Sequence, residues 1–149
     1  MRAVIQRVTE AEVTVAQQVA GRIEHGLVAL VGFAETDRPD DLGWMARKIA
    51  GLCIFNDNEG KMNLSLADIN GQALIVSQFT LFGDCRKGKR PSFESAAGME
   101  RAKALYEYLV EKCKQSNLVI GKGVFRESML VDLVNDGPVT ILLDSKKIF

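Results

Sequence analysis

With 149 residues, of which 47% are hydrophobic and 26% charged, the chain has the size and composition of a single globular domain spanning residues 1–149. No apolar run approaches the ~18–20 residues of a membrane span, and the alternating N-terminus lacks the apolar block of a signal peptide, so we expect a cytoplasmic protein without a membrane partner. The formal net charge is zero, so the total charge gives no reason to expect a polyanionic partner.

The cysteines and the single histidine exclude several kinds of site. Cys53, Cys85 and Cys113 lie far apart and form no CxxC pair, which argues against a disulfide framework and against structural zinc. A histidine-based zinc site or a Ser-His-Asp triad would have to use His25, which lies in a turn-like setting before a predicted strand. We therefore expect chemistry without histidine, and neither a metal nor a cofactor.

The strand candidates begin at the N-terminus. Residues 2–15, RAVIQRVTEAEVTV, alternate apolar and polar side chains, as does a strand with one buried face. Residues 27–33 form a short apolar run opened by Gly26. The later strand candidates are residues 73–82, 118–125, 129–136 and 139–144.

Two segments have the pattern of helices. In residues 36–52, Pro39 suits a first helical turn with Thr36 or Asp37 as the cap, and apolar residues recur at helical spacing. Residues 94–117 repeat apolar side chains on one face and charged side chains on the other. Alternating strands with only two main helices favour an α/β (α+β) fold with mixed, largely antiparallel β-sheets in a single compact domain.

The stretch VNDGPVT, residues 134–140, separates the last two strand candidates. Asn135 and Asp136 are typical turn residues, and Gly137 and Pro138 follow them directly. We therefore expect a chain reversal here between two strands.

Polar residues end the apolar strand ALIV. Ser77, Gln78 and Thr80 follow it in SQFTL, and the ends of buried strands are where ligands commonly meet α/β proteins. Alternatively, Ser77 or Thr80 merely satisfies the backbone at a strand end.

A dense basic cluster comes next in the chain. Within DCRKGKRP, four cations lie within five positions around Gly88: Arg86, Lys87, Lys89 and Arg90. Such a cluster can neutralise phosphates even on a protein of zero net charge, and the alternative is an ordinary solvated loop.

Four stretches taken together resemble the D-aminoacyl-tRNA deacylase (D-tyrosyl-tRNA deacylase) family. They are MRAVIQRV at the N-terminus, SQFTL, the basic RKGKRPSF, and NDGPVT near the C-terminus. The likeness extends from Met1 to about Asp144. It implies an enzyme that cleaves D-amino acids from mischarged tRNA, with tRNA as substrate and a homodimer as the working form. No DNA partner is expected.

The resemblance also implies residue roles. Gly137-Pro138, with a cis peptide bond, would reach into the partner subunit's pocket and act as the chiral reader, and Arg7 would orient it. Glycine lets the backbone approach a ligand closely and proline fixes its own φ, so a rigid reader can reject L-aminoacyl groups by shape while glycyl-tRNA escapes. Phe125 and Met129 match pocket positions. The alternatives are a surface charge for Arg7 and plain core roles for Phe125 and Met129.

The catalytic step is assigned to Ser77, Gln78, Phe79 and Thr80. An aminoacyl ester is already activated, so hydrolysis needs a placed water and a stabilised oxyanion. No basic partner for the Thr80 hydroxyl is evident nearby, so we give Thr80 a positioning role, with the N–H groups of Phe79 and Thr80 holding the carbonyl oxygen and the 2′-hydroxyl of the terminal adenosine helping to activate water.

The four cations of the basic cluster would contact acceptor-end phosphates. One departure from the family pattern is Arg126-Glu127-Ser128, which stands where members carry small residues such as Gly-Ala-Asp. Two other functions remain open: a related deacylase with relaxed chirality, and a tRNA-binding module without turnover.

Overall fold

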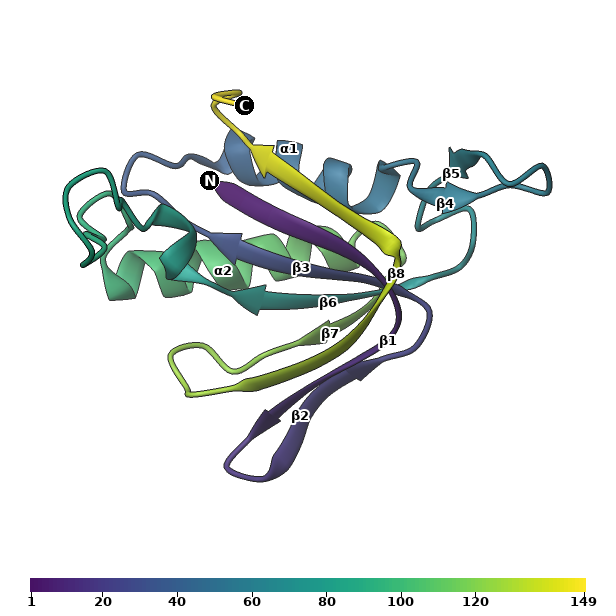
Figure 1. Cartoon of the computed structure of the whole chain (residues 1–149), viewed down its shortest axis with the longest axis horizontal. Helices are drawn as coiled ribbons and strands as arrows, with labels where there is room; N and C mark the ends of the chain where they lie inside the picture. The colour runs from purple at the N-terminus through teal and green to yellow at the C-terminus, as the bar shows by residue number, and fades with distance from the viewer.

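The computed structural model describes residues 1–149 and contains eight strands, two α-helices and one 3₁₀-helix (Figure 1). The strands are β1 (Arg2–Val15), β2 (Gln18–Ile23), β3 (Gly26–Gly32), β4 (Phe55–Asn56), β5 (Met62–Leu64), β6 (Gln72–Ser77), β7 (Val119–Lys122) and β8 (Leu130–Asp144). The helices are α1 (Pro39–Gly51), α2 (Met99–Lys114) and the 3₁₀-helix η1 (Phe79–Phe82).

The long strand β1 organises the main sheet. One edge of β1 pairs with β8 along most of its length, and the other edge pairs first with β3 and then with β2, all antiparallel. The sheet continues from β3 through β6 to β7 with parallel pairing, and the chain crosses over through α1 and α2. The expected fold class, mixed and largely antiparallel with two main helices, is confirmed.

The sheet curls until β2 approaches β7 (Figure 1). Glycine permits this approach, because a Cβ at Gly21 would lie 2.5 Å from the carbonyl oxygen of Lys122. Apolar side chains fill the inside of the curl, among them Val8, Val13 and Leu74. The far end of the sheet is therefore a half-closed barrel with a small core of its own.

Both α-helices pack on the other face of the sheet and form the larger core (Figure 1). Leu42, Met45 and Ile49 of α1 are fully buried at the spacing expected from the sequence, and α2 buries Leu109 and Cys113 in the same way. Burial raises the pKa of the Cys113 thiol to about 12, so this cysteine stays neutral in the core. Neither helix is long and apolar enough to cross a membrane.

The predicted chain reversal at residues 134–140 is wrong, because β8 continues through it as one strand. Val134 pairs with Glu10 and Thr140 with Gln6, so both halves run antiparallel to β1. Between the Asn135–Val8 and Thr140–Gln6 pairs, β8 advances five positions while β1 advances two. The extra residues of β8 bulge outward. The turn-forming residues thus adopt a local bend inside the strand, and the chain is not reversed.

The amide of Asn135 closes this bulge by donating to the carbonyl oxygens of Arg7 at 2.9 Å and Val139 at 3.0 Å. Gly137 has a φ of +119°, a conformation that side-chain-bearing residues rarely adopt. The Gly137–Pro138 peptide bond is cis, and both residues are exposed.

The expected cap of the first helix is also wrong. Helix α1 starts at Pro39 with Arg38 as its N-cap, and the Asp41 carboxylate accepts the Arg38 N–H. Asp37 is unavailable for capping because its buried carboxylate binds the α-ammonium of Met1 at 2.5 Å.

Two predicted strands are shorter than expected. The segment 73–82 leaves the sheet after Ser77 and turns into η1, and the strand predicted at 118–125 is confined to β7.

Residues 55–63, with the sequence FNDNEGKMN, form the hairpin of β4 and β5.

Candidate functional site

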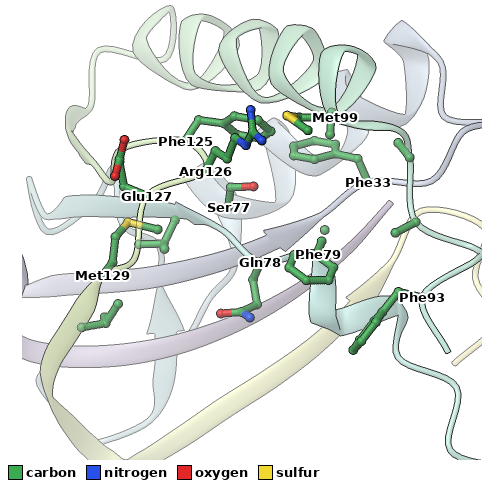
Figure 2. Close-up of a pocket in the computed structure, with 16 residues that line it drawn as sticks. Phe33, Ser77, Gln78, Phe79, Phe93, Met99, Phe125, Arg126, Glu127 and Met129 are labelled. Atoms are coloured by element: carbon green, nitrogen blue, oxygen red, sulfur yellow. The ribbon is translucent and has the colours of Figure 1, made fainter. Parts of the chain in front are cut away.

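A pocket of about 540 Å³ opens where β3 and β6 end, next to the first residue of α2 (Figure 2). Eleven of its sixteen lining residues are hydrophobic. Its larger apolar side chains come from separate segments of the chain: Phe33, Phe79, Phe93, Met99, Phe125 and Met129. The carboxyl ends of parallel strands are a common location for ligand sites in open α/β sheets.

Ser77 and Gln78 supply neutral polar groups on the pocket wall. The backbone N–H of Gln78 donates to the carbonyl of Val31 at 2.7 Å, which holds this residue against the end of β3. Its side-chain amide donates to the hydroxyl of Thr80. The strand end therefore presents a short row of polar groups to an otherwise apolar cavity.

Thr80 is exposed and lies next to the pocket without lining it. Its hydroxyl has one side-chain partner, and this partner is a donor, so no group in the chain is in place to remove its proton. The only histidine, His25, packs edge-on against Phe55 at 5.5 Å, and its carbonyl accepts the N–H of Gln72 at the opposite end of β6. Activation of Thr80 by histidine is thus excluded within one chain.

The 3₁₀-helix η1 forms the solvent-facing wall of the pocket. Phe79 is 56% exposed and meets Phe93 edge-to-face at a centroid distance of 5.0 Å. The N–H groups of Phe79 and Thr80 stand at the start of this helix, where N–H groups lack an acceptor in the helix itself, and neither donates to a turn or loop carbonyl. These two donors therefore lie at the start of η1, beside the pocket.

The basic loop, residues 84–92, connects the segments that carry Phe79 and Phe93, so it adjoins the same side of the pocket. Two backbone hydrogen bonds between Asp84 and Ser92, at 2.8 and 2.9 Å, close the loop at its base. Arg86 pairs with Asp84 at 2.6 Å, and the hydrogen bonds from Arg86 lower the pKa of Asp84 to about 2. Three cations remain exposed without an acidic partner: Lys87, Lys89 and Arg90.

The opposite wall is the loop after β7, which carries Phe125 and Met129. Phe125 packs on Tyr106 of α2 at a centroid distance of 5.9 Å. The Tyr106 hydroxyl donates to the carbonyls of Ile75 at 2.8 Å and Gly123 at 3.4 Å, and burial raises its pKa to about 12, so it remains a donor at neutral pH. Tyr106 thus ties α2 to the base of this loop.

Arg7 is 7% exposed and lies under the bulge of β8. Its guanidinium donates to the carbonyl of Ile54 at 2.6 Å and to the carbonyl of Asp136 at 3.3 Å, and it pairs with the Asp136 carboxylate at 3.1 Å. A Cβ at Gly137 would lie 3.0 Å from the Arg7 guanidinium. The bulge is therefore held tightly from beneath, while Gly137 and Pro138 face outward.

The structure does not bring the bulge and the pocket of one chain together. Arg7 pairs with Leu27 near the start of β3, whereas Ser77 pairs with Val31 near its end. Four strand residues span about 13 Å. The bulge of β8 therefore lies level with the start of β3, and the pocket lies at the end of β3.

Part of the pocket lining lies outside the residues predicted from the sequence. Phe33 is the last residue of a predicted strand, and Phe93 ends the basic stretch RKGKRPSF, so both had a signal in the chain order. Met99 had none, because nothing local indicates that the start of α2 meets the end of β6. Arg126 and Glu127, noted for their unusual types, also line the pocket.

The comparisons with known proteins agree with one another. The family model described as D-Tyr-tRNA(Tyr) deacylase matches residues 4–144. Proteins named D-aminoacyl-tRNA deacylase from Thermotoga petrophila and Desulfotalea psychrophila are 56% and 57% identical to the chain, with full coverage of both partners.

Two solved structures are also similar. One, named c-Myc DNA Unwinding Element Binding Protein, has a TM-score of 0.91 at 39% identity and covers 97% of this chain and 98% of its own. The other, described as a probable eukaryotic D-amino acid tRNA deacylase, has a TM-score of 0.82 at 16% identity, covers 95% of this chain and 97% of its own, and supports the fold alone.

Proposed function

The chain belongs to the D-Tyr-tRNA(Tyr) deacylase family, and we propose that the pocket beside η1 is its hydrolytic site. The activity of the family is hydrolysis of D-aminoacyl-tRNA, which releases the free D-amino acid and the tRNA. One observation carries the assignment of the site: an apolar cavity at the strand ends, with the N–H groups at the start of η1 and a basic loop on the same side.

The tRNA acceptor end binds across this side of the molecule. The unpaired cations of the basic loop contact phosphates of the acceptor end, and the aromatic walls take the terminal adenosine and its aminoacyl group. A zero net charge does not oppose this, because the relevant positive charge is concentrated in one loop next to the pocket.

Hydrolysis relies on positioning instead of an ionised nucleophile. The N–H groups of Phe79 and Thr80 hold the carbonyl oxygen as it gains negative charge, and the 2′-hydroxyl of the terminal adenosine helps to activate the attacking water. The Thr80 hydroxyl accepts a hydrogen bond from Gln78, which leaves its own proton free to donate to the substrate. Ser77 and Gln78 keep the ester at the strand end.

Chiral selection comes from Gly137 and Pro138 of a second copy of the chain in a homodimer. Within one subunit these residues lie about 13 Å along the sheet from the pocket, so they act on a substrate only when a partner presents them. Their outward exposure and the support from Arg7 fit a rigid reader that an L-side chain would strike. Glycyl-tRNA, which has no side chain, escapes this filter.

The outer edge of β8 supports the dimer. No strand of the chain pairs with this edge, and three large apolar side chains of β8 are exposed: Leu130, Val134 and Leu142. An unpaired edge with apolar side chains is unfavourable in water and is commonly covered by a partner.

We further propose that the enzyme works in the cytoplasm.

Ester loss from D-tyrosyl-, L-tyrosyl- and glycyl-tRNA tests the proposal. We expect rapid loss of the D-ester, measurable loss of the glycyl ester and no loss of the L-ester. Loss of both tyrosyl esters would support a deacylase of relaxed chirality, and tRNA binding with no ester loss would support a binding module. Duplex DNA enters the assay as competitor because one solved relative is named for a DNA element, and we expect it not to displace tRNA.

A matched pair of glycine variants distinguishes a role of Gly137 in chiral selection from a general effect of backbone strain. Gly137 and Gly60 both have positive φ, but a Cβ at Gly137 would meet Arg7 and Val139, whereas nothing lies within 4 Å of a Cβ at Gly60. Gly137→Ala is expected to lower D-tyrosyl turnover or to admit the L-ester, and Gly60→Ala to change neither. Equal behaviour of the two variants would contradict a reading role for the bulge.

A further inference from the structure

Arg126 stands out among the residues of the pocket. Arg126 and Glu127 are the only charged side chains that line it, and Figure 2 shows Arg126 extending beside Phe125. The Arg126 guanidinium makes no hydrogen bond, ion pair or ring contact within the chain. Its side chain is exposed, as are those of Arg47 and Arg90, which also lack a partner, but Arg126 alone among these three lines the pocket.

The backbone at Arg126 would suit glycine better than arginine. The N–H of Glu127 donates to the carbonyl of Val124 at 3.3 Å, and Arg126, the third residue of this turn, has a φ of +71°. This combination is that of a type II turn, whose third position favours glycine because side-chain-bearing residues are strained there. Neither the backbone conformation nor any polar contact within the chain therefore accounts for an arginine at this position.

We propose that Arg126 binds an anionic group of the bound substrate. A guanidinium offers several donors in one plane and pairs well with a carboxylate or a phosphate. The inference rests on the proposed function of the pocket, and an aminoacylated acceptor end carries such a group in two places: the phosphate next to the terminal adenosine, and the side chain of a D-aspartyl or D-glutamyl ester.

This contact is separate from the basic loop. The basic loop follows η1 on the side of Phe79 and Phe93, whereas Arg126 follows β7 beside Phe125. Arg126 is thus a cation on the second wall of the cavity, close enough to the pocket to distinguish substrates by their charge.

Three variants and three substrates test the proposal. Arg126→Gly introduces the residue that the turn favours, Arg126→Lys keeps the charge without the planar fork, and Lys122→Gln, which removes an exposed cation of β7 outside the pocket, is the control. The substrates are D-aspartyl-tRNA, D-tyrosyl-tRNA and the D-tyrosyl ester of adenosine, which has no phosphate. For Arg126→Gly we expect about a tenfold loss of kcat/KM, equivalent to about 1.4 kcal/mol, with a Tm equal to or above that of the wild type.

The pattern of loss identifies the anion. A loss confined to D-aspartyl-tRNA assigns Arg126 to the side-chain carboxylate. An equal loss for both tRNAs, absent with the adenosine ester, assigns it to the phosphate. No loss on any tRNA, an equal loss on the adenosine ester, or a lowered Tm overturns the proposal.

Binding of tRNA analogues with an amide in place of the ester is measured in parallel. A wild-type protein without turnover would contradict the proposed function, and the change in Kd for Arg126→Gly would still decide the role of Arg126.

Discussion

The buried ion pair at the N-terminus leads to a strong prediction about stability. The α-ammonium of Met1 and the carboxylate of Asp37 are both fully buried and lie 2.5 Å apart. The ammonium also donates to the Ser145 hydroxyl at 2.7 Å, and Asp37 accepts the N–H of Ala34 at 2.8 Å. This cluster joins the start of β1, the segment before α1 and the end of β8. Asp37→Asn keeps the shape of the side chain and removes its charge.

The expected effect is large because the remaining charge has no route to water. Removing one partner of a buried ion pair typically costs about 3–5 kcal/mol, since the other charge is left uncompensated in a medium of low polarity. The free energy of unfolding of a domain is typically about 5–15 kcal/mol, so Asp37→Asn would remove a substantial part of the stability. An additional residue before Met1 should have a similar effect, because it moves the ammonium out of its site.

Urea denaturation at neutral pH measures this effect. We expect the midpoint for Asp37→Asn to fall by roughly 1.5–3 M at unchanged slope. The control is Glu111→Gln, which removes an exposed pair with Lys114 and should cost about 0.5 kcal/mol or less. If Asp37→Asn stays within about 1 kcal/mol of the wild type, the reasoning about the buried ammonium is wrong.

Four further predictions concern single groups. Tyr106→Phe removes a buried donor to two carbonyls and should lower the free energy of unfolding by about 1–2 kcal/mol in thermal melts, whereas no change would show that water replaces it. Burial raises the pKa of Asp41, but hydrogen bonds from Lys146 and the Arg38 N–H outweigh it and lower the pKa to about 2. Asp41→Asn should therefore lower the free energy of unfolding by about 1 kcal/mol above pH 4. In urea denaturation this difference from the wild type should shrink as the pH falls towards 2, and a difference that does not change with pH would contradict the lowered pKa. Thr80→Ala should keep substantial deacylase activity because Thr80 positions the ester, and a complete loss at an unchanged Tm would make it the nucleophile. Lys87→Ala should weaken binding of all tRNAs and reduce the slope of log K against log salt by about 1, and an unchanged slope would remove the basic loop from the interface.

Local patterns were sufficient for most of the secondary structure. The alternation over Arg2–Val15 and the helical spacing of Leu42, Met45 and Ile49 predicted β1 and α1, because period and burial on one face are linked within a single element. Ser77, Gln78 and Phe79 of the polar strand end SQFTL line the pocket, since residues after a buried strand emerge at one edge of the sheet.

The segment Asn135–Pro138 shows where local patterns fail. Its residues suit a turn, and a turn predicts a reversal, but the same residues form a bulge when the strand continues along β1. The pairing of β8 with β1, more than 120 residues away in the chain, decides between the two outcomes. No window of sequence contains that information.

The sequence by itself determined the two helices, most of the strands and, through its resemblance to a family, the kind of reaction. Only the tertiary structure decided that Phe33, Phe93, Met99 and Phe125 enclose one cavity and that Arg126 lines it without a polar partner. It also decided that the β8 bulge with Gly137 lies level with the start of β3, away from the pocket at its end. The physical reason is that periodicity and turn preference act over a few residues, whereas a pocket is formed by side chains that meet only after distant strands and helices have packed.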